Sequence, residues 1–205
     1  MELRTVSKSD PDFRALLRGT FSRELVALPM RSLNVNTSSE VVTFQLVPLQ
    51  EVERPKSLPL ILSLLRIETL AFSLGPVLVA LIAAFRMGYS VQLETSIFAV
   101  LSILFFHLSL NLFNDYFDHL KGQDRLNPRG GSRVIQKGWV RAYLVERWAF
   151  GFLLVAANLA LPIFFEHKLL SVLVSLGVLF LGIEYSSERL GLKYRGWSEV
   201  IVFIL

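Results

Sequence analysis

The sequence predicts an all-α membrane protein, a polytopic bundle of transmembrane helices that follows a polar N-terminal arm. Hydrophobic residues make up 53% of the 205 residues, and the mean hydropathy is +0.51. Both values exceed those of an ordinary soluble domain. Several apolar stretches also approach the roughly 20 residues that a helix needs to cross a bilayer. The lipid bilayer is therefore the first expected partner.

Residues 1–57 form the arm. They mix charged residues, Ser, Thr and Pro without an apolar run of membrane-spanning length, and no secretory signal opens the chain. We expect an extramembrane arm of uncertain order and attach no chemistry to it. Residues 41–47 have the composition of a short strand or of an interfacial segment.

Residues 58–205 form the membrane part. Apolar runs predict four complete spans and a fifth that is cut short. The spans are expected at 60–85, 95–114, 147–165 and 169–185, and the fifth begins near residue 198. The stretch 198–205 is too short to cross a bilayer.

Lys and Arg positions orient these spans. The loop 119–147 is rich in basic residues, whereas the short loops on the other side carry only Arg86 and Lys168. The positive-inside rule therefore predicts a multi-pass protein of the cell (inner) membrane with its arm and this loop in the cytoplasm. The basic residues flank apolar spans, so they explain the net charge of +4 without a nucleic-acid partner.

An acidic run, 111–124, lies where the second apolar stretch ends. On a helix, Asn111, Asp115 and Asp118 fall at i, i+4 and i+7 and share one face, with Asn114 at its edge. Carboxylates at the mouth of a membrane helix are costly unless a positive group binds there. The chain has no cysteine, so oxygen ligands remain, and these suit Mg²⁺. The alternative is an acidic helix end solvated by headgroup water.

A glycine-rich basic loop, 127–138, follows the acidic run. Its glycines let backbone amides approach an anion, and cationic side chains donate charge-assisted hydrogen bonds to phosphate oxygens. The alternative is a flexible basic loop that obeys only the topology rule. The candidate diphosphate-binding cations here are Lys121, Arg129, Arg133 and Lys137.

The two motifs together resemble the UbiA superfamily of intramembrane aromatic prenyltransferases, and most closely its 1,4-dihydroxy-2-naphthoate polyprenyltransferase branch. The resemblance extends from about residue 62 to 205 and also includes the stretch 66–79. Its specific motifs are Asn114-Asp115-x-x-Asp118 with Gly122-x-Asp124, Gly131-Ser132-Arg133-Val134-Ile135-Gln136-x-Gly138, and Tyr185 with Leu192-Lys193-Tyr194-Arg195-Gly196-x-x-Glu199.

The resemblance implies a fold of about nine helices with two Asp-rich motifs that bind Mg²⁺ and an isoprenyl diphosphate. Asn114, Asp115 and Asp118 would be catalytic. The implied metal ligands are Asn111, Asn114, Asp115, Asp118 and Asp124, and Tyr185 and Arg189 join the diphosphate-binding residues. The second Asp-rich motif lies beyond the end of this sequence, so we expect an N-terminal portion that is inactive by itself.

The implied reaction transfers a polyprenyl group from polyprenyl diphosphate to an aromatic acceptor in menaquinone biosynthesis. Many relatives have a carboxylate at the position of Gly122, whereas here the carboxylate is Asp124, which favours the naphthoate branch. Other acceptors stay open: 4-hydroxybenzoate, homogentisate, chlorophyllide or a lipid glycerol. A transporter or a noncatalytic membrane fragment would also carry charged residues in its spans.

Four further residues are candidates for the acceptor site or the cavity. Phe113, Tyr116 and Phe117 would shield an allylic cation by cation–π contact, although packing or lipid contact explains each equally well. Arg66 would be expensive facing lipid, so we expect it to face the cavity. His107, inside an apolar span, is expected to be a hydrogen-bonded polar group rather than a metal ligand.

Overall fold

The computed structural model describes residues 2–127, 130–166, 168–187, 189–196 and 200. The chain divides into two compact units. Unit 1 contains Met1–Leu65 and Leu112–Arg147, and unit 2 contains Arg66–Asn111 and Trp148–Leu205. Unit 1 therefore joins the arm to the acidic run and the basic loop.

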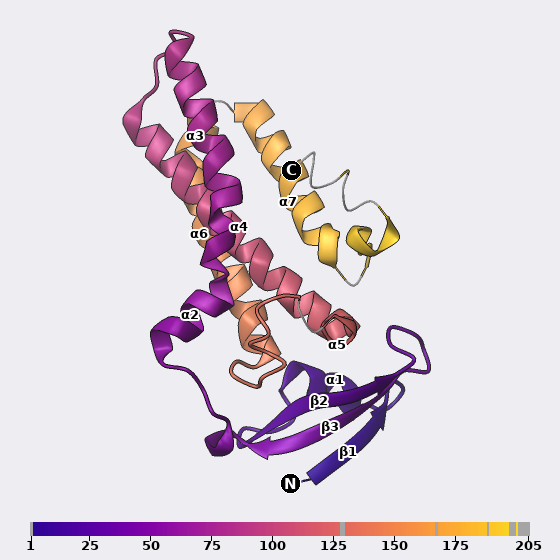
Figure 1. Cartoon of the computed structure of the whole chain (residues 1–205). Coiled ribbons are helices and arrows are strands. Elements are labelled where there is room, and N and C mark those ends of the chain that lie inside the picture. Colours follow the sequence, from indigo (N-terminus) through magenta and orange to yellow (C-terminus); the bar gives the residue numbers. More distant parts are fainter. Residues whose placement is uncertain (1, 128–129, 167, 188, 197–199, 201–205) are drawn as a thin grey trace. The chain divides into compact units, whose positions relative to one another are not determined.

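The arm folds around a three-stranded antiparallel sheet (Figure 1). Its strands are β1 (Glu2–Ser7), β2 (Leu25–Leu33) and β3 (Val41–Pro48), in the order β1-β3-β2. The strand alternative for residues 41–47 is thus confirmed. The helical membrane part agrees with expectation, but the all-α class was wrong for the whole chain because the arm contributes this sheet.

The sheet forms because apolar residues alternate along β3. Val42, Phe44 and Leu46 are buried on one face, and polar or half-exposed residues occupy the other. Helix α1 (Asp12–Arg18) adds Leu16 and Leu17 to this core. The helix ends at Gly19, whose φ of +73° gives the left-handed cap that a glycine adopts without strain.

The rest of unit 1 comprises α2 (Ser57–Leu65), the last turns of α4 (Leu93–Lys121), the short α5 (Gln123–Leu126) and the start of α6 (Ala142–Glu166), while η1 (Leu49–Glu51) lies in the arm. The loop before α6 contacts the arm. Trp139 Nε1 donates a hydrogen bond to the Glu53 carbonyl at 2.9 Å. Gly138 has a φ of +70°, and a Cβ built on it would lie 2.8 Å from Leu28 Cδ2, so the loop approaches β2 closely at a position that favours glycine.

The described residues of unit 2 form helices joined by turns and short irregular segments, with no strand among them. It contains η2 (Ile67–Leu70), α3 (Ala71–Arg86), the first part of α4, the later part of α6, α7 (Lys168–Ser186) and η3 (Leu192–Arg195). Two serines of α4 tie it to α6, since Ser102 Oγ donates to the Ala156 carbonyl and Ser109 Oγ to the Ala149 carbonyl, both at 2.8 Å. These bonds satisfy hydroxyls that lipid could not.

Three helical segments are long and apolar enough to cross a membrane among the described residues: Ile67–Arg86, Leu93–Lys121 and Ala142–Phe164. A continuous first span from residue 60 was wrong, because the helix breaks at Arg66, which has a φ of +50°. The fourth expected span corresponds to α7, whose apolar stretch Val172–Ser186 is shorter. The expected fifth span lies, except for residue 200, outside the described residues.

The core of the arm yields a stability prediction. Phe44 is fully buried, so Phe44→Ala should cost about 3–5 kcal/mol through lost burial and the cavity that remains. Hydrogen exchange of the β3 amides in the full-length protein should accelerate accordingly. Leu3→Ala, at a position 62% exposed on β1, is the matched control and should leave exchange unchanged. Equal acceleration in both variants would contradict this core.

Candidate functional site

The last turns of α4 carry most of the predicted site. The helix continues without interruption to Lys121, as the spacing of the acidic run requires. Asp115 and Asp118 are only 3% and 7% exposed. Asn114 Nδ2 donates to Asp118 Oδ2 at 3.2 Å, which is the i, i+4 pairing expected on one helix face. Two carboxylates are thus buried at the end of a membrane-length helix.

Asp124 reaches the site from a different element. Helix α4 ends at Gly122, whose left-handed φ of +75° turns the chain into α5. Asp124 lies on α5 and is 5% exposed. Its Oδ2 accepts a hydrogen bond from Gln136 Nε2, and its backbone carbonyl accepts one from the Arg133 guanidinium. The turn at Gly122 therefore returns a third carboxylate to the end of α4.

The glycine-rich loop passes directly over two of these carboxylates. The Ser132 backbone amide donates to Asp115 Oδ2 at 3.1 Å. Gly131 has a φ of +67°, and a Cβ built on it would lie 3.1 Å from Asp115 Oδ1 and 3.5 Å from Asp124 Oδ1. The Asp115 and Asp124 carboxylates therefore converge on Gly131. A side chain at this position would crowd both of them.

This donor set fits a hard cation such as Mg²⁺. Among the described residues, no three or more His, Cys, Asp or Glu side chains are grouped to hold a metal ion. Mg²⁺, however, is commonly bound by one or two carboxylates, with substrate phosphates and waters completing its octahedron. The two carboxylates that meet at Gly131 match that requirement.

The cationic residues predicted for diphosphate have varied surroundings. Arg133 donates to the Asp124 carbonyl, and Lys137 Nζ lies 4.3 Å from the centre of the Trp139 ring. Lys121 is half-buried at the end of α4. Arg129 lies outside the described residues. Within unit 1, the loop therefore places Arg133 beside the carboxylates, whereas Lys137 contacts an aromatic ring.

The other predicted site residues lie in unit 2 or are buried aromatic side chains of unit 1. Tyr185 is in unit 2, with Lys193 Nζ 5.9 Å from its ring centre, and Arg189 is exposed there. Arg66 is half-buried at the break before η2. In unit 1, Phe113 and Tyr116 are buried.

These two rings form a row with Phe117. The Phe113 and Phe117 rings stack with centroids 6.0 Å apart, and Tyr116 and Phe117 lie 5.3 Å apart. Phe113 is 2% exposed and Tyr116 is 3% exposed. The geometry gives these two side chains a packing role within unit 1.

A polar cluster inside unit 2 accounts for His107. Its Nε2 lies 2.9 Å from Thr69 Oγ1, and its Nδ1 lies 2.7 Å from Ser73 Oγ. The imidazole is therefore hydrogen-bonded at both nitrogens, as expected. Asn111, predicted as a metal ligand, donates from Nδ2 to Thr69 Oγ1 at 2.9 Å. No motif in the sequence marks Thr69 or Ser73, although both lie within the first apolar run.

Three further residues at the acidic site were missed from the sequence. Gln136 belongs to the glycine-rich motif but received no role, and His119 directly follows Asp118. Glu40 comes from the arm and forms a buried ion pair with Arg125, whose side chain is 6% exposed. Adjacency to the motifs signalled Gln136 and His119, whereas no local pattern pointed to Glu40.

The convergence at Gly131 leads to a test by paired glycine variants. Gly131→Ala adds backbone strain and pushes a methyl group against two carboxylates. Gly88→Ala adds the same strain at a φ of +80° with nothing within 4 Å. The Gly131 variant should therefore lose about 1–3 kcal/mol more stability, as overpacking of a buried site typically costs. Thermal unfolding of the purified protein measures this, and equal losses would refute the crowding at Gly131.

Comparisons with known proteins bear on the membrane part. No curated protein and no solved structure matches the chain. Residues 73–205 match the family model described as the UbiA prenyltransferase family. The match begins within α3, includes the acidic run and the glycine-rich loop, and covers well over half of the chain. The protein therefore belongs to the UbiA prenyltransferase family.

Proposed function

We propose that this protein transfers a polyprenyl group from polyprenyl diphosphate to 1,4-dihydroxy-2-naphthoate in menaquinone biosynthesis. Family membership supports a prenyltransferase in the membrane. The observation that carries the proposal is the convergence of Asp115 and Asp124 on Gly131, in a loop whose Arg133 donates a hydrogen bond to the Asp124 backbone carbonyl. Asp124 supports the naphthoate branch because many relatives carry this carboxylate at the position of Gly122 instead.

The residues proposed to hold Mg²⁺ are Asp115 and Asp124, with Asn114, Asp118 and Asn111 contributing from α4. When bound, Mg²⁺ supplies positive charge that offsets the charge of the leaving diphosphate. The two buried carboxylates supply fixed negative charge at one point. The loop amides and the cationic side chains of Lys121, Arg133 and Lys137 orient the diphosphate and stabilise its departure.

In the proposed reaction, the allylic carbon–oxygen bond of the prenyl diphosphate breaks and diphosphate leaves. The ring carbon of the naphthoate that bears the carboxylate forms the new carbon–carbon bond, and CO₂ departs with its bonding electrons left in the ring. The chain contributes binding, orientation and charge, so no covalent protein intermediate is needed.

The acidic site should be indispensable for this reaction. We expect Asp115→Ala or Asp118→Ala in the full-length protein to lower prenyl transfer at least about 100-fold, the effect typical of lost electrostatic stabilisation. The measurement uses labelled prenyl diphosphate and the naphthoate acceptor at saturating Mg²⁺. Asp12→Ala, which removes only an exposed pair with Arg4, should change little. Full activity of Asp115→Ala would sink the assignment.

Topology can be tested independently. The positive-inside rule places the arm and the loop 119–147 in the cytoplasm. The chain lacks cysteine, so single cysteines report without background. An impermeant thiol reagent applied to intact cells should label Tyr89→Cys, in the loop after α3, and spare Leu126→Cys; both native side chains are exposed. The reverse pattern would invert the proposed orientation.

A further inference from the structure

We propose that Glu40 of the N-terminal arm is a positioning residue for the acidic site, acting through Arg125 on Asp124. The arm would then be a working part of the enzyme rather than a separate appendage. This inference rests on the proposed function, because it assigns Asp124 to the Mg²⁺-diphosphate site.

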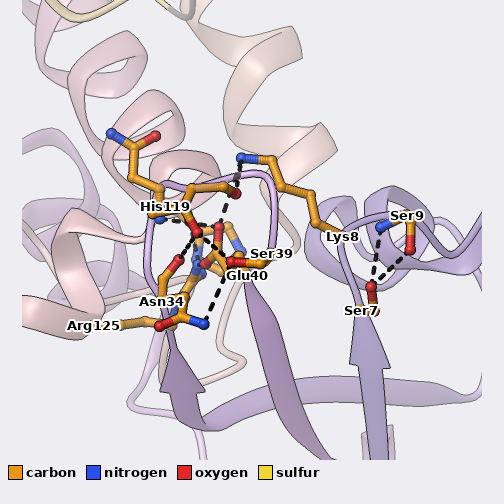
Figure 2. A network of polar contacts seen from close by, with 10 residues as sticks. Ser7, Lys8, Ser9, Asn34, Ser39, Glu40, His119 and Arg125 are labelled. Atoms are coloured by element: carbon orange, nitrogen blue, oxygen red, sulfur yellow. Dashed lines mark hydrogen bonds and ion pairs between the residues drawn. The ribbon is translucent and has the colours of Figure 1, made fainter.

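Glu40 occupies a buried position where both of its oxygens are engaged. Its side chain is 1% exposed and lies just before β3. Oε1 accepts from the Arg125 guanidinium, while Oε2 accepts from the Asn36 backbone amide at 3.2 Å and lies 3.8 Å from Lys8 Nζ. Figure 2 shows Lys8 and Arg125 meeting at this carboxylate. A fully buried carboxylate is costly to desolvate, so sheet packing alone does not explain it.

Arg125 connects this carboxylate to the end of α4. Its Nη1 donates to the His119 carbonyl at 3.1 Å, while its Nη2 binds Glu40. Burial lowers the pKa of Arg125, and the neighbouring Glu40 carboxylate opposes that shift. Glu40 supplies the counter-charge for this buried guanidinium.

The anchored arginine determines how Asp124 is presented. Helix α5 has four residues, Gln123–Leu126, and a single turn has little stability of its own. Arg125 directly follows Asp124, so fixing the arginine side chain fixes the turn that carries the carboxylate. Truncating Glu40 would leave a buried cation unpaired and release this turn.

A second connection runs from the arm to the same carboxylate. Gln136 Nε2 donates to Asp124 Oδ2 and lies 3.2 Å from His119 Nδ1. An amide nitrogen only donates, so Nδ1 accepts, and His119 Nε2 donates to the Leu17 carbonyl of α1 at 2.9 Å. His119 is 2% exposed. Two contacts with the arm, at Glu40 and at Leu17, therefore lead to Asp124.

The backbone at Gly122 is also shaped for the arm. A Cβ at this position would collide with the Arg125 guanidinium and would lie 2.6 Å from Val35 Cγ1, in the loop between β2 and β3. The φ of +75° disfavours a side chain as well. Because Gly122 has no side chain, the turn between α4 and α5 leaves room for both Val35 of the arm loop and the Arg125 guanidinium.

The test measures binding of Mg²⁺ with inorganic diphosphate to the full chain, read as ligand-induced protection against thermal unfolding. Glu40→Gln should raise the half-saturating concentration at least about tenfold, as is typical when a residue that orients a metal ligand is removed. Glu40→Asp keeps the charge but shortens the reach, and should give a smaller increase. Asp12→Asn, in the exposed pair with Arg4, is the matched arm control and should bind like the wild type.

A double-variant cycle separates positioning from general stability. If Glu40 acts through Arg125, adding Glu40→Gln to Arg125→Met should weaken binding no further than Arg125→Met alone. Additive losses of binding in the double variant would overturn the inference. So would wild-type binding by Glu40→Gln if Asp124→Asn binds more weakly. Intact binding without prenyl transfer would refute the proposed reaction and leave the positioning role standing. No protection of the wild type would refute both.

Discussion

Carboxylates removed from water must be hydrogen-bonded or paired, and the construction of unit 1 depends on this requirement. Asp115 is bound by the Ser132 amide, Asp124 by Gln136, and Glu40 by Arg125. Each bond joins two different segments of the chain, and the third spans 85 residues. Satisfying these three groups therefore brings the arm, the end of α4 and the glycine-rich loop together.

The family match and the compact units divide the chain differently. The match begins at residue 73, whereas unit 1 combines the arm with Leu112–Arg147. The arm thus lies outside the matched region but contacts the most characteristic part of it. Glycines favour this contact, since a Cβ built on Gly122 would lie 2.6 Å from Val35 Cγ1 and one on Gly138 would lie 2.8 Å from Leu28 Cδ2. Close backbone approach at these glycines and the buried ion pair of Glu40 with Arg125 together hold the arm to this region.

Much of the membrane part could be predicted from local pattern. Hydropathy located the helices that became α3, α4 and α6, and the i, i+4, i+7 spacing of Asn111, Asp115 and Asp118 correctly placed them on one continuous helix. The break at Arg66 escaped prediction because apolar residues lie on both sides of it and hide the left-handed residue. The sheet of the arm was also underestimated, because only β3 alternates cleanly between buried and more exposed residues.

By itself, the sequence determined the membrane class, the oxygen-rich character of the site and the family, because these follow from composition and from spacing within single elements. Only the tertiary structure decided that Asp124 returns to Asp115 across Gly131, and that Glu40 meets Arg125. The physical reason is the separation along the chain. A buried charge must find a partner wherever the fold can supply one, and here the partner lies 85 residues away.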